Sequence, residues 1–467
     1  MILATYLKGF AYLMKQAVSG SEKTFTEGNI NRSIFLLAVP MVLEMATESL
    51  FVCVNLFYVS RLGKEAIAIS GAAESVTSFT YSLATGLGVA ASAIIARRVG
   101  EKKYRTAGLS AMQIIYIAGL FSAFLGIACF FFYREILSAM GLSSELIEAG
   151  KWYVRIAFAG IPLIIVRSAI NGIFRGAGDA SLAMKTMWIS NGVNIVLAPI
   201  LLFGWGSFPA IGLPGIAVAG IVARAIAVAY QASFLIWGKT IIVIGRKQLL
   251  PVPSLIRKTI KLAAAGAVQY MVPASSWIIM IKIVAHFGSS ALAGYVIAQR
   301  VTTIALLPAW GIGNAAGTLT GQNLGAGQPE RAEQSVWRAG LFNMTFLTLG
   351  AVFWWMFAEP VVGLFTENRE VLDNSVMYIH YITIAYVLLA YTMVISRALN
   401  ASGQVRTVTL LYILMFYVTQ IPLSYILGIW LDWGPKGIFT AILIAEIVLA
   451  TACIFTFRAG KWKSQRI

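Results

Sequence analysis

Two glutamates inside an apolar segment are the side chains of this sequence best placed to do chemistry. Residues 34–60 are apolar and long enough to cross a bilayer, because about 20 residues of helix span the hydrocarbon core. Glu44 and Glu48 lie one helical turn apart in this segment, and Asn55 falls on roughly the same side. Carboxylates at such depth are costly and almost always face a bundle interior or a water-filled cavity. We therefore expect either a cation or substrate site here or a structural ion pair.

A buried carboxylate suits the binding of a coupling ion. Burial disfavours its charged form, so it takes up a proton readily, and with further oxygens it can hold Na+. Glu48 is our first candidate, with a sodium site near it as the alternative to a proton. Glu44 is the second, and Glu74 in the next apolar segment is the third. The side chains that can hydrogen-bond to these acids are Asn55, Asn171, Asn191 and Asn194.

Two arginines compete with this interpretation. Arg167 and Arg224 lie near mid-depth of the fourth and sixth apolar segments. They can neutralise two of the glutamates as buried ion pairs, with Glu74 as one partner, and such pairs do not titrate near neutrality. Alternatively, they hold an anionic substrate, because the guanidinium fork matches carboxylate and phosphate groups. Both interpretations stay open at the level of the sequence.

The second half of the chain offers weaker candidates. Glu446 lies about two turns inside the last apolar segment, and we expect it to pair with Arg300 or His380. Aromatic rings can also line a cavity for flat organic cations. The candidates for that role are Phe51, Tyr58, Tyr81, Tyr153, Tyr270, Trp277, Tyr378, Tyr381 and Tyr386.

The composition is that of an integral membrane protein. Of the 467 residues, 59% are hydrophobic and 12% charged, whereas soluble domains carry about 25% charged residues. The net charge of +17 sits in short loops between apolar segments, which argues for membrane orientation and against nucleic-acid binding. Three cysteines and two histidines lack metal-type spacing, and no P-loop occurs. We expect no cofactor beyond a coupling ion, H+ or Na+, and a monomer whose partners are a small-molecule substrate and membrane lipid.

Twelve apolar segments predict an all-α membrane fold, because an open strand in lipid leaves backbone groups unsatisfied. The first six are residues 34–60, 67–96, 109–132, 153–174, 182–203 and 213–237. The last six are residues 260–285, 291–319, 336–357, 376–399, 408–430 and 438–457. We divide the chain into an interfacial segment 1–30, an N-lobe 31–238, a linker 239–258, a C-lobe 259–458 and a tail 459–467. In the interfacial segment, Tyr6, Phe10, Leu13 and Ala17 recur at helical spacing and predict an amphipathic helix.

Loop charges predict the orientation of the chain. Lysine and arginine cluster after the even-numbered segments, in residues 97–105, in the linker 239–258 and in the tail 459–467. Arg175 after the fourth segment and Arg397 at the end of the tenth belong to the same set of loop charges. The alternate loops, such as 204–212 and 286–290, are nearly free of them. Since basic loops stay in the cytoplasm, both termini are expected there, with the chain in the inner membrane.

The two halves repeat each other at a constant offset of 225 positions. This offset pairs a glycine with a glycine at four places along the halves, and it pairs Tyr153 with Tyr378. The glycine pairs are Gly63 with Gly288, Gly100 with Gly325, Gly178 with Gly403 and Gly212 with Gly437. Because six segments are an even number, both halves keep one orientation and are related by an axis along the membrane normal. Such lobes can rock about a central cavity and alternate access between the two sides.

Three segments resemble the signatures of the multidrug and toxic compound extrusion (MATE) transporters. These are GQNLGAGQPERA at 321–332, its partner ARRVGEKKYRTA at 96–107 and FRGAGD at 174–179. The resemblance covers roughly residues 31–457. It implies twelve helices in two six-helix lobes that form a V around a substrate cavity. It also implies export of organic, often cationic, compounds by antiport with protons or sodium.

The acids that the family often uses for ion coupling are replaced in this sequence. Asn55 stands where the resemblance expects an aspartate in the first segment, and Ala198 takes the place of the acid in NIVLAP. In the second half, Pro273 and Leu389 stand at the expected acidic positions. The resemblance therefore does not carry the family's coupling mechanism over unchanged.

Other functions remain as alternatives to export of cationic or amphipathic compounds. One is a flippase for a lipid-linked sugar or precursor, which predicts a strongly basic cavity. Another is an exporter of anionic metabolites, to which Arg167 and Arg224 point. An intramembrane enzyme or receptor is disfavoured, because neither accounts for the parallel repeat.

Overall fold

The computed structural model describes residues 2–20, 24–60, 62, 64–205, 209–237, 240–242 and 244–465, with helix as the dominant element. Ten helices in this part of the chain are long and apolar enough to span a membrane, and two bent helix pairs bring the number to twelve. The expected all-α membrane fold is thus confirmed. Helices satisfy their own backbone hydrogen bonds, which lipid cannot do.

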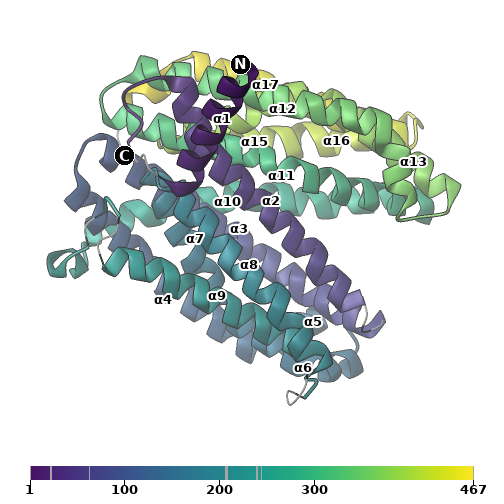
Figure 1. The fold of residues 1–467 in the computed structure, drawn as a ribbon. Coiled ribbons are helices and arrows are strands. Elements are labelled where there is room, and N and C mark those ends of the chain that lie inside the picture. The colour runs from purple at the N-terminus through teal and green to yellow at the C-terminus, as the bar shows by residue number, and fades with distance from the viewer. Residues whose placement is uncertain are drawn as a thin grey trace.

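The two halves of the chain form two lobes (Figure 1). The helices of the first are α2 (Ile30–Ser60), α3 (Lys64–Gly100), α4 (Tyr104–Phe131), the short α5 (Tyr133–Ala139), α6 (Ser144–Ala159), α7 (Ile161–Gly176), α8 (Ala180–Phe203) and α9 (Leu213–Ile236). Those of the second are α10 (Pro253–Ala285), α11 (Ser289–Gly325), α12 (Pro329–Gly363), α13 (Arg369–Ile384), α14 (Tyr386–Ala401), α15 (Val405–Ile413), α16 (Ile421–Tyr425) and α17 (Pro435–Arg458). The lobes lie together near the C-terminus and diverge toward α6 and α13, like a V.

Several helices extend beyond the apolar segments that predicted them. α3 begins before the expected residue 67 and continues to Gly100, so its last turn contains Arg97 and Arg98. α10 begins at Pro253, inside the stretch assigned to a linker. Proline suits the first turn of a helix because its missing N–H has no partner there anyway. The helices thus continue into polar flanking residues, beyond the apolar stretch that hydropathy detects.

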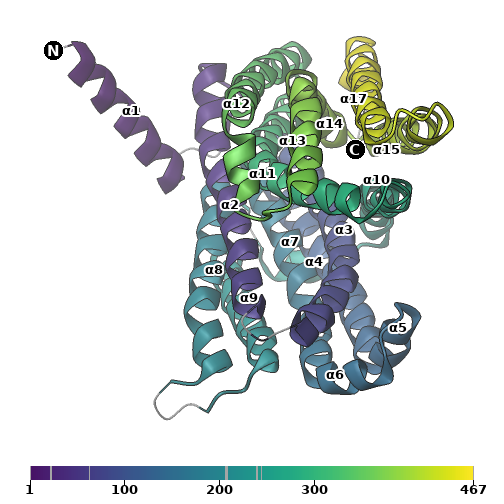
Figure 2. The same cartoon turned by 90° about the vertical axis from the view of Figure 1, so that its right-hand side faces the viewer.

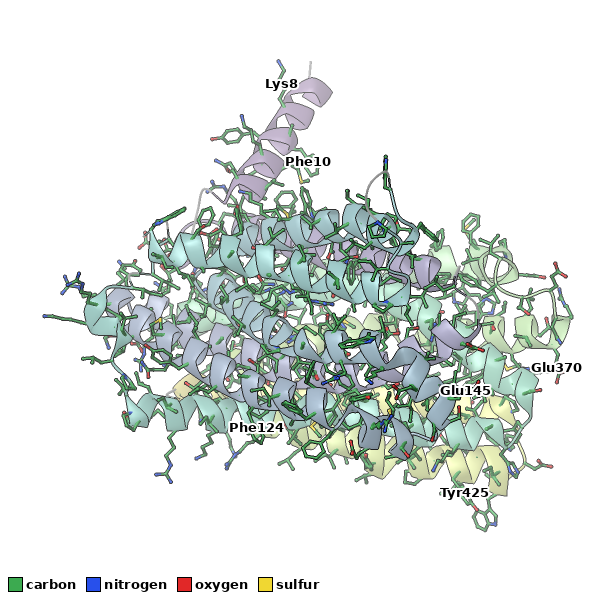
Figure 3. All side chains as sticks on the ribbon, turned by 90° about the horizontal axis from the view of Figure 1, so that it is seen from below. Lys8, Phe10, Phe124, Glu145, Glu370 and Tyr425 are labelled. Carbon is green, nitrogen blue, oxygen red and sulfur yellow. The ribbon has the colours of Figure 1, made fainter. Side chains whose placement is uncertain are left out.

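The structural repeat follows the sequence repeat through most of each lobe. α3 and α11 start at Lys64 and Ser289, and α6 and α13 start at Ser144 and Arg369, each pair 225 positions apart. The break between α6 and α7 recurs between α13 and α14, where the chain bends by 59°. Figure 3 shows Glu145 and its equivalent Glu370 toward the same end of the molecule. The lobes therefore share one orientation.

The offset of 225 fails at the last helix of each lobe. Gly212 precedes α9 with φ 71°, and the residue with that role before α17 is Gly434, with φ 64°. Gly215 and Gly437 are likewise equivalent, because each backs onto a carbonyl oxygen of the preceding helix, Leu201 or Leu427. The predicted pairing of Gly212 with Gly437 is therefore wrong by three residues. The loop before α9 is longer than the loop before α17, and sequence identity alone did not reveal the gap.

Glycines let the two lobes cross at close range in the middle of the interface. A Cβ on Gly86 of α3 would lie 2.3 Å from the backbone nitrogen of Ala267 in α10. A Cβ on Gly311 of α11 would lie 2.6 Å from the backbone nitrogen of Val42 in α2. The two contacts are equivalent under the repeat, so each lobe's first helix packs on the other lobe's second helix. Small residues allow such close helix packing in membranes.

A second pair of glycines joins the lobes near the ends of α3 and α11. A Cβ on Gly100 would lie 2.0 Å from the carbonyl oxygen of Gln322, and one on Gly325 would lie 2.2 Å from that of Arg97. Gln322 also donates to the carbonyl of Gly176 at 3.3 Å. The lobes are thus in backbone contact at the end where the basic loops lie.

The first helix, α1 (Ile2–Ser19), projects from the two lobes (Figure 2) and contacts α2 along part of its length. Phe10 is 54% exposed, and its ring lies edge-on to that of Phe35 in α2 with the ring centres 5.7 Å apart, while Lys8 projects from the same part of the helix (Figure 3). Ala17, near the other end, is buried. The helix that the spacing predicted is present, while the side chain of Tyr6 lies outside the described residues. Its exposed apolar face fits the expected interfacial position.

Candidate functional site

Glu44 lies at the centre of a buried polar network in the first lobe. Its side chain is fully buried, and its carboxylate receives Arg175 Nη2 at 2.5 Å and Nε at 3.2 Å. Asn171 Nδ2 donates to the same carboxylate at 3.3 Å, and Gln231 donates to Asn171 Oδ1 at 2.5 Å. These contacts connect α2, α7 and α9. A two-pronged guanidinium pair of this kind holds a carboxylate in a defined position.

The partner of Glu44 differs from the expected one. The sequence offered Arg167 and Arg224 as neutralising groups, whereas the structure uses Arg175. We had counted Arg175 among the loop charges that indicate orientation. It belongs to the FRGAGD segment and ends the last turn of α7. Its carbonyl accepts a hydrogen bond from Thr318 of α11 at 3.0 Å, so the ion pair adjoins the contact between lobes.

Glu48 has different surroundings one turn along α2. It is half-buried, and its Oε2 atom is buried without a hydrogen-bond partner among the described residues. Asn191 Nδ2 donates to the neighbouring carbonyl of Thr47 at 3.1 Å. The Oδ1 atom of Asn194, one turn farther along α8, is also buried and unpartnered. The structure thus brings Asn191 to the side of α8 that faces α2, while the amide of Asn194 lies toward Gly220 of α9.

Arg167 is buried in the same lobe without a carboxylate against it. Its exposed fraction is 7%, Nη1 contacts Met187 Sδ at 3.1 Å, and Nε has no partner in the described part of the chain. It lies one turn from Asn171 along α7, just as Glu48 lies one turn from Glu44 along α2. The helix registers therefore place Arg167 and Glu48 at a similar level, one layer away from the Glu44–Arg175 pair.

The remaining predicted residues of the first lobe lie outside these networks. Glu74 is exposed and Arg224 half-exposed, and both are within electrostatic range of the Tyr153 hydroxyl. No ion pair between Glu74 and Arg224 is found among the described contacts. The side chain of Asn55 lies outside the part of the chain that the structure describes.

A cavity of about 480 Å³ lies in the second lobe, next to α3. A volume of this size takes a drug-sized molecule. Four of the predicted aromatic residues line it, namely Tyr81, Tyr270, Trp277 and Tyr378. Phe51, Tyr58, Tyr153, Tyr381 and Tyr386 are not among its lining residues. The acids of the first lobe, Glu44 and Glu48, do not line it either.

With α3 of the first lobe on one side, the walls of the cavity come from α10, α11, α13, α14, α17 and the helix that contains α15 and α16. That helix has wide π-helical turns over Leu414–Gln420 and Ile426–Trp430, and Phe416 and Gln420 line the cavity. Its counterpart in the first lobe, α8, is a regular α-helix. Such π-helical turns occur often at functional sites. The two lobes thus differ at the place where the cavity forms.

Two charged side chains of opposite sign line the cavity, Arg397 of α14 and Glu446 of α17. The guanidinium carbon of Arg397 lies 5.5 Å from the ring centre of Tyr270. Glu446 is 9% exposed, and its Oε2 atom lacks a hydrogen-bond partner within the described residues. The predicted pairing of Glu446 with Arg300 or His380 is wrong. Arg300 is exposed, and the ring of His380 stacks on Trp355 at 4.4 Å.

Polar groups without partners also mark this cavity. The buried Gln269 Oε1 and Ser276 Oγ have no hydrogen bond among the described residues, and both side chains line the space. Tyr378, by contrast, donates to Gln299. Sequence reasoning treated Arg397 as a loop charge and did not anticipate its place in the wall. The described part of the chain contains no cluster of His, Cys, Asp and Glu that could hold a metal.

Comparison with known proteins gives consistent matches along the whole chain. The MatE family model matches residues 40–200 and 267–426, one region in each lobe. The FAD transporter of Shewanella oneidensis is 24% identical over 426 residues, which are 91% of this chain and 94% of the relative. The probable multidrug resistance protein YpnP of Bacillus subtilis is 24% identical over 446 residues, 95% of this chain and 98% of the relative.

Solved structures of similar proteins have the same fold. A multidrug resistance MATE family transporter of the MOP superfamily in an outward-facing conformation aligns with a TM-score of 0.86 at 25% identity, over 94% of this chain and 98% of the other. A MOP superfamily transporter from Pyrococcus furiosus, described as having a binding pocket of reversed polarity, aligns with a TM-score of 0.87 at 23% identity, over 95% and 100%.

Proposed function

The chain belongs to the MatE family, the multidrug and toxic compound extrusion transporters, and we propose that it exports organic compounds by antiport with protons or sodium. Membership makes it a multi-pass membrane transporter and not an enzyme. The observation that carries the proposal is the pair of equivalent lobes, in contact at one end and diverging at the other. Two such lobes can rock against each other, so that they open at one end of the molecule or at the other.

The direction of opening follows from the loop charges. If the basic loops and both termini are cytoplasmic, then the lobes touch on the cytoplasmic side and diverge toward the outside. That arrangement corresponds to an outward-open state from which a substrate leaves. The fold match to a transporter in an outward-facing conformation supports this assignment.

The cavity in the second lobe supports a small organic substrate. Its aromatic walls suit flat rings and cationic groups, and Glu446 adds a carboxyl group as a hydrogen-bond partner. A flippase for a lipid-linked precursor predicts a strongly basic cavity, whereas this one has a single arginine, Arg397, among its lining residues. Export of anionic compounds is the second candidate, because none of the ion pairs among the described residues involves Arg167 or Arg397 and a relative is named a FAD transporter.

Glu48 remains our candidate for ion coupling. Glu44 already accepts two hydrogen bonds from Arg175, so a coupling ion would have to displace a two-pronged pair to bind there. Glu48 has a buried oxygen without a partner among the described residues, and Asn191 of α8 contacts its neighbour Thr47, so the amide oxygen of Asn191 is a candidate ligand for a sodium ion there. A proton or Na+ bound at Glu48 would neutralise its carboxylate and leave the positive charge of Arg167 in the same lobe less compensated. We expect this shift in charge balance to change the conformation of the first lobe.

Reconstitution into liposomes tests the proposed function. Gradients of pH and of sodium are imposed separately, and accumulation of a cationic dye is compared with that of an anionic dye. We expect dye movement with one of the two gradients and none without a gradient. Absence of movement for both dyes under every gradient contradicts the proposal and favours the lipid-flippase alternative.

A further inference from the structure

An arginine without a counter-charge lies between α4 and α6 of the first lobe. None of the ion pairs in the described part of the chain involves Arg155 of α6. Its side chain is half-buried, and its Nε atom is buried without a hydrogen-bond partner among the described residues. A cation that has lost part of its hydration is costly unless a negative group lies against it. Arg155 therefore favours a bound anion.

Three aromatic rings hold the guanidinium group of Arg155 in place. Its central carbon lies 4.3 Å from the ring centre of Phe130 in α4. The ring centres of Tyr133 in α5 and Trp152 in α6 are each 5.6 Å away. Ring faces attract a cation, but they do not accept N–H hydrogen bonds as the oxygens of an anion do. The rings thus position the charge of Arg155 without neutralising it.

The position of this group along the helices is that of a membrane interface. Phe130 is the last residue but one of α4, which ends at Phe131. Phe131 and Trp152 are 67% and 61% exposed, and tryptophan is enriched where the hydrocarbon core meets the lipid headgroups. α6 lies at the end where the lobes diverge (Figure 1), which the loop charges assign to the outside. The rule that retains basic residues in the cytoplasm therefore does not account for Arg155.

The acids of the same region do not compensate Arg155. Glu148 pairs with Arg134 and with Lys151, so two other cations already share its carboxylate. Glu135 and Glu145 are exposed, and neither forms an ion pair among the described contacts. The negative group that Arg155 favours must therefore come from outside the described part of the chain.

We propose that Arg155 and its three rings form a binding site for the phosphate of an anionic phospholipid in the outer leaflet. The guanidinium fork matches phosphate oxygens, and the exposed rings of Phe131 and Trp152 lie where the acyl chains of that lipid begin. A zwitterionic headgroup brings its own ammonium group, which cancels the charge of its phosphate and leaves Arg155 uncompensated. The site is separate from the cavity of the second lobe and does not depend on the proposed export activity.

A fluorophore next to the site reports which lipid binds there. In a background without the native cysteines, Ile127→Cys carries the label on α4, one turn from Phe130 and Phe131, at a position that is 59% exposed. The full chain is placed in lipid nanodiscs that contain nitroxide-labelled phosphatidylglycerol or nitroxide-labelled phosphatidylcholine with the same acyl chains. We expect phosphatidylglycerol to associate about fivefold more strongly, as judged by quenching, because one cation near an anionic membrane surface contributes about that factor.

Variants assign the lipid preference to Arg155. Arg155→Gln should abolish it, whereas Arg155→Lys, which keeps the charge and loses the fork, should retain part of it and exclude misfolding as the explanation. Lys282→Gln, at an exposed cation in the last turn of α10, is the matched control and should leave the preference unchanged.

Three outcomes overturn the proposal. One is equal quenching by the two lipids in the parent protein. Another is an unchanged preference in Arg155→Gln, even with a lower unfolding temperature, which assigns Arg155 only to the packing of the rings. The third is loss of quenching by phosphatidylglycerol on addition of water-soluble glycerol phosphate at the concentration of the lipid, which assigns the site to a free phosphate.

Discussion

Glu44 and Glu48 occupy neighbouring turns of α2, yet their surroundings assign them different chemistry. The Glu44 carboxylate receives two bonds from Arg175 and one from Asn171, so its charge is compensated in place. Glu48 keeps a buried oxygen without a partner among the described residues. Burial alone does not decide whether an acid in a membrane helix exchanges ions. The presence of a fixed counter-charge does.

Glu44→Gln should strongly destabilise the protein. The substitution leaves the charge of Arg175 buried without its partner, and breaking a buried pair in this way costs about 3–5 kcal/mol. We expect a clear drop in the thermal unfolding temperature in detergent. The double variant Glu44→Gln with Arg175→Gln should recover part of the loss, because neither charge remains. Glu74→Gln, at an exposed acid, serves as the control and should unfold like the parent. Equal stability of Glu44→Gln and Glu74→Gln would falsify the structural role.

Glu48→Gln should leave the stability nearly unchanged and alter ion dependence. The amide can neither bind a proton at working pH nor neutralise Na+, so the gradient that drives dye movement should lose its effect. The measurement is dye movement in liposomes as a function of the imposed pH or sodium gradient. Glu74→Gln is again the matched control. Unchanged ion dependence in Glu48→Gln rules out Glu48 as the coupling acid.

At the scale of elements, four glycines determine how the lobes meet. α3 crosses α10 and α11, while α2 crosses α11, and the crossing points lack room for a Cβ atom. The contacts at Gly100 and Gly325 are equivalent under the repeat, so each lobe offers the same surface to the other. Close contact between backbone atoms provides dispersion attraction, and the lobes can part here without pulling large interlocked apolar side chains away from each other. Such an interface is suited to opening and closing.

Gly100→Ala or Gly325→Ala should weaken the closed end of the molecule. The added methyl group meets a carbonyl oxygen at 2.0 Å or 2.2 Å, and such overpacking costs about 1–3 kcal/mol. A cysteine at position 318, where Thr318 is fully buried near this contact, reports the change. We expect it to react faster with a thiol reagent in either variant. Gly119→Ala in α4, where an added Cβ meets nothing within 4 Å, should leave the rate unchanged. An unchanged rate in all three variants means that these glycines do not hold the closed end.

At the scale of the whole molecule, the two lobes differ although they descend from one repeat pattern. The first lobe contains the Glu44–Arg175 network and the unpartnered Glu48. The second contains the aromatic cavity beside its π-helical turns. The proposed function assigns ion coupling to one lobe and substrate binding to the other. Movement of the lobes about their shared crossing points then links the two events.

The orientation of the whole molecule can be tested by labelling single cysteines. In a background where the three native cysteines are replaced, Lys103→Cys and His286→Cys place a thiol in a basic and in a non-basic loop. Both positions are exposed, so both thiols are reachable once a reagent is on their side. A membrane-impermeant maleimide added to intact cells should label position 286, and position 103 only after permeabilisation. The reverse result contradicts the assignment of cytoplasmic termini and of the outward-open state.

Much of the candidate site lay beyond prediction, and the reasons are physical. Glu44 was recognised as buried because hydropathy and depth are properties of one segment. Its partner Arg175 is 131 positions away, and the pairing depends on how α2 and α7 are rotated toward each other. For the same reason, the sequence placed Arg397 among the loop charges and Glu446 in an ion pair with Arg300 or His380. The spacing of residues within one helix does not reveal which charged side chain on another helix neutralises them.

The sequence by itself determined the membrane class, the number of spans, the parallel repeat and the family. These follow from hydropathy, from segment length and from a constant offset, all of which are local or pairwise along the chain. Only the tertiary structure showed that the repeat offset at the last helix of each lobe is three residues shorter than the offset of 225 elsewhere, as the equivalent Gly212 and Gly434 show. It also decided which acid is neutralised and which lobe holds the cavity, because helix packing alone brings distant side chains together or keeps them apart.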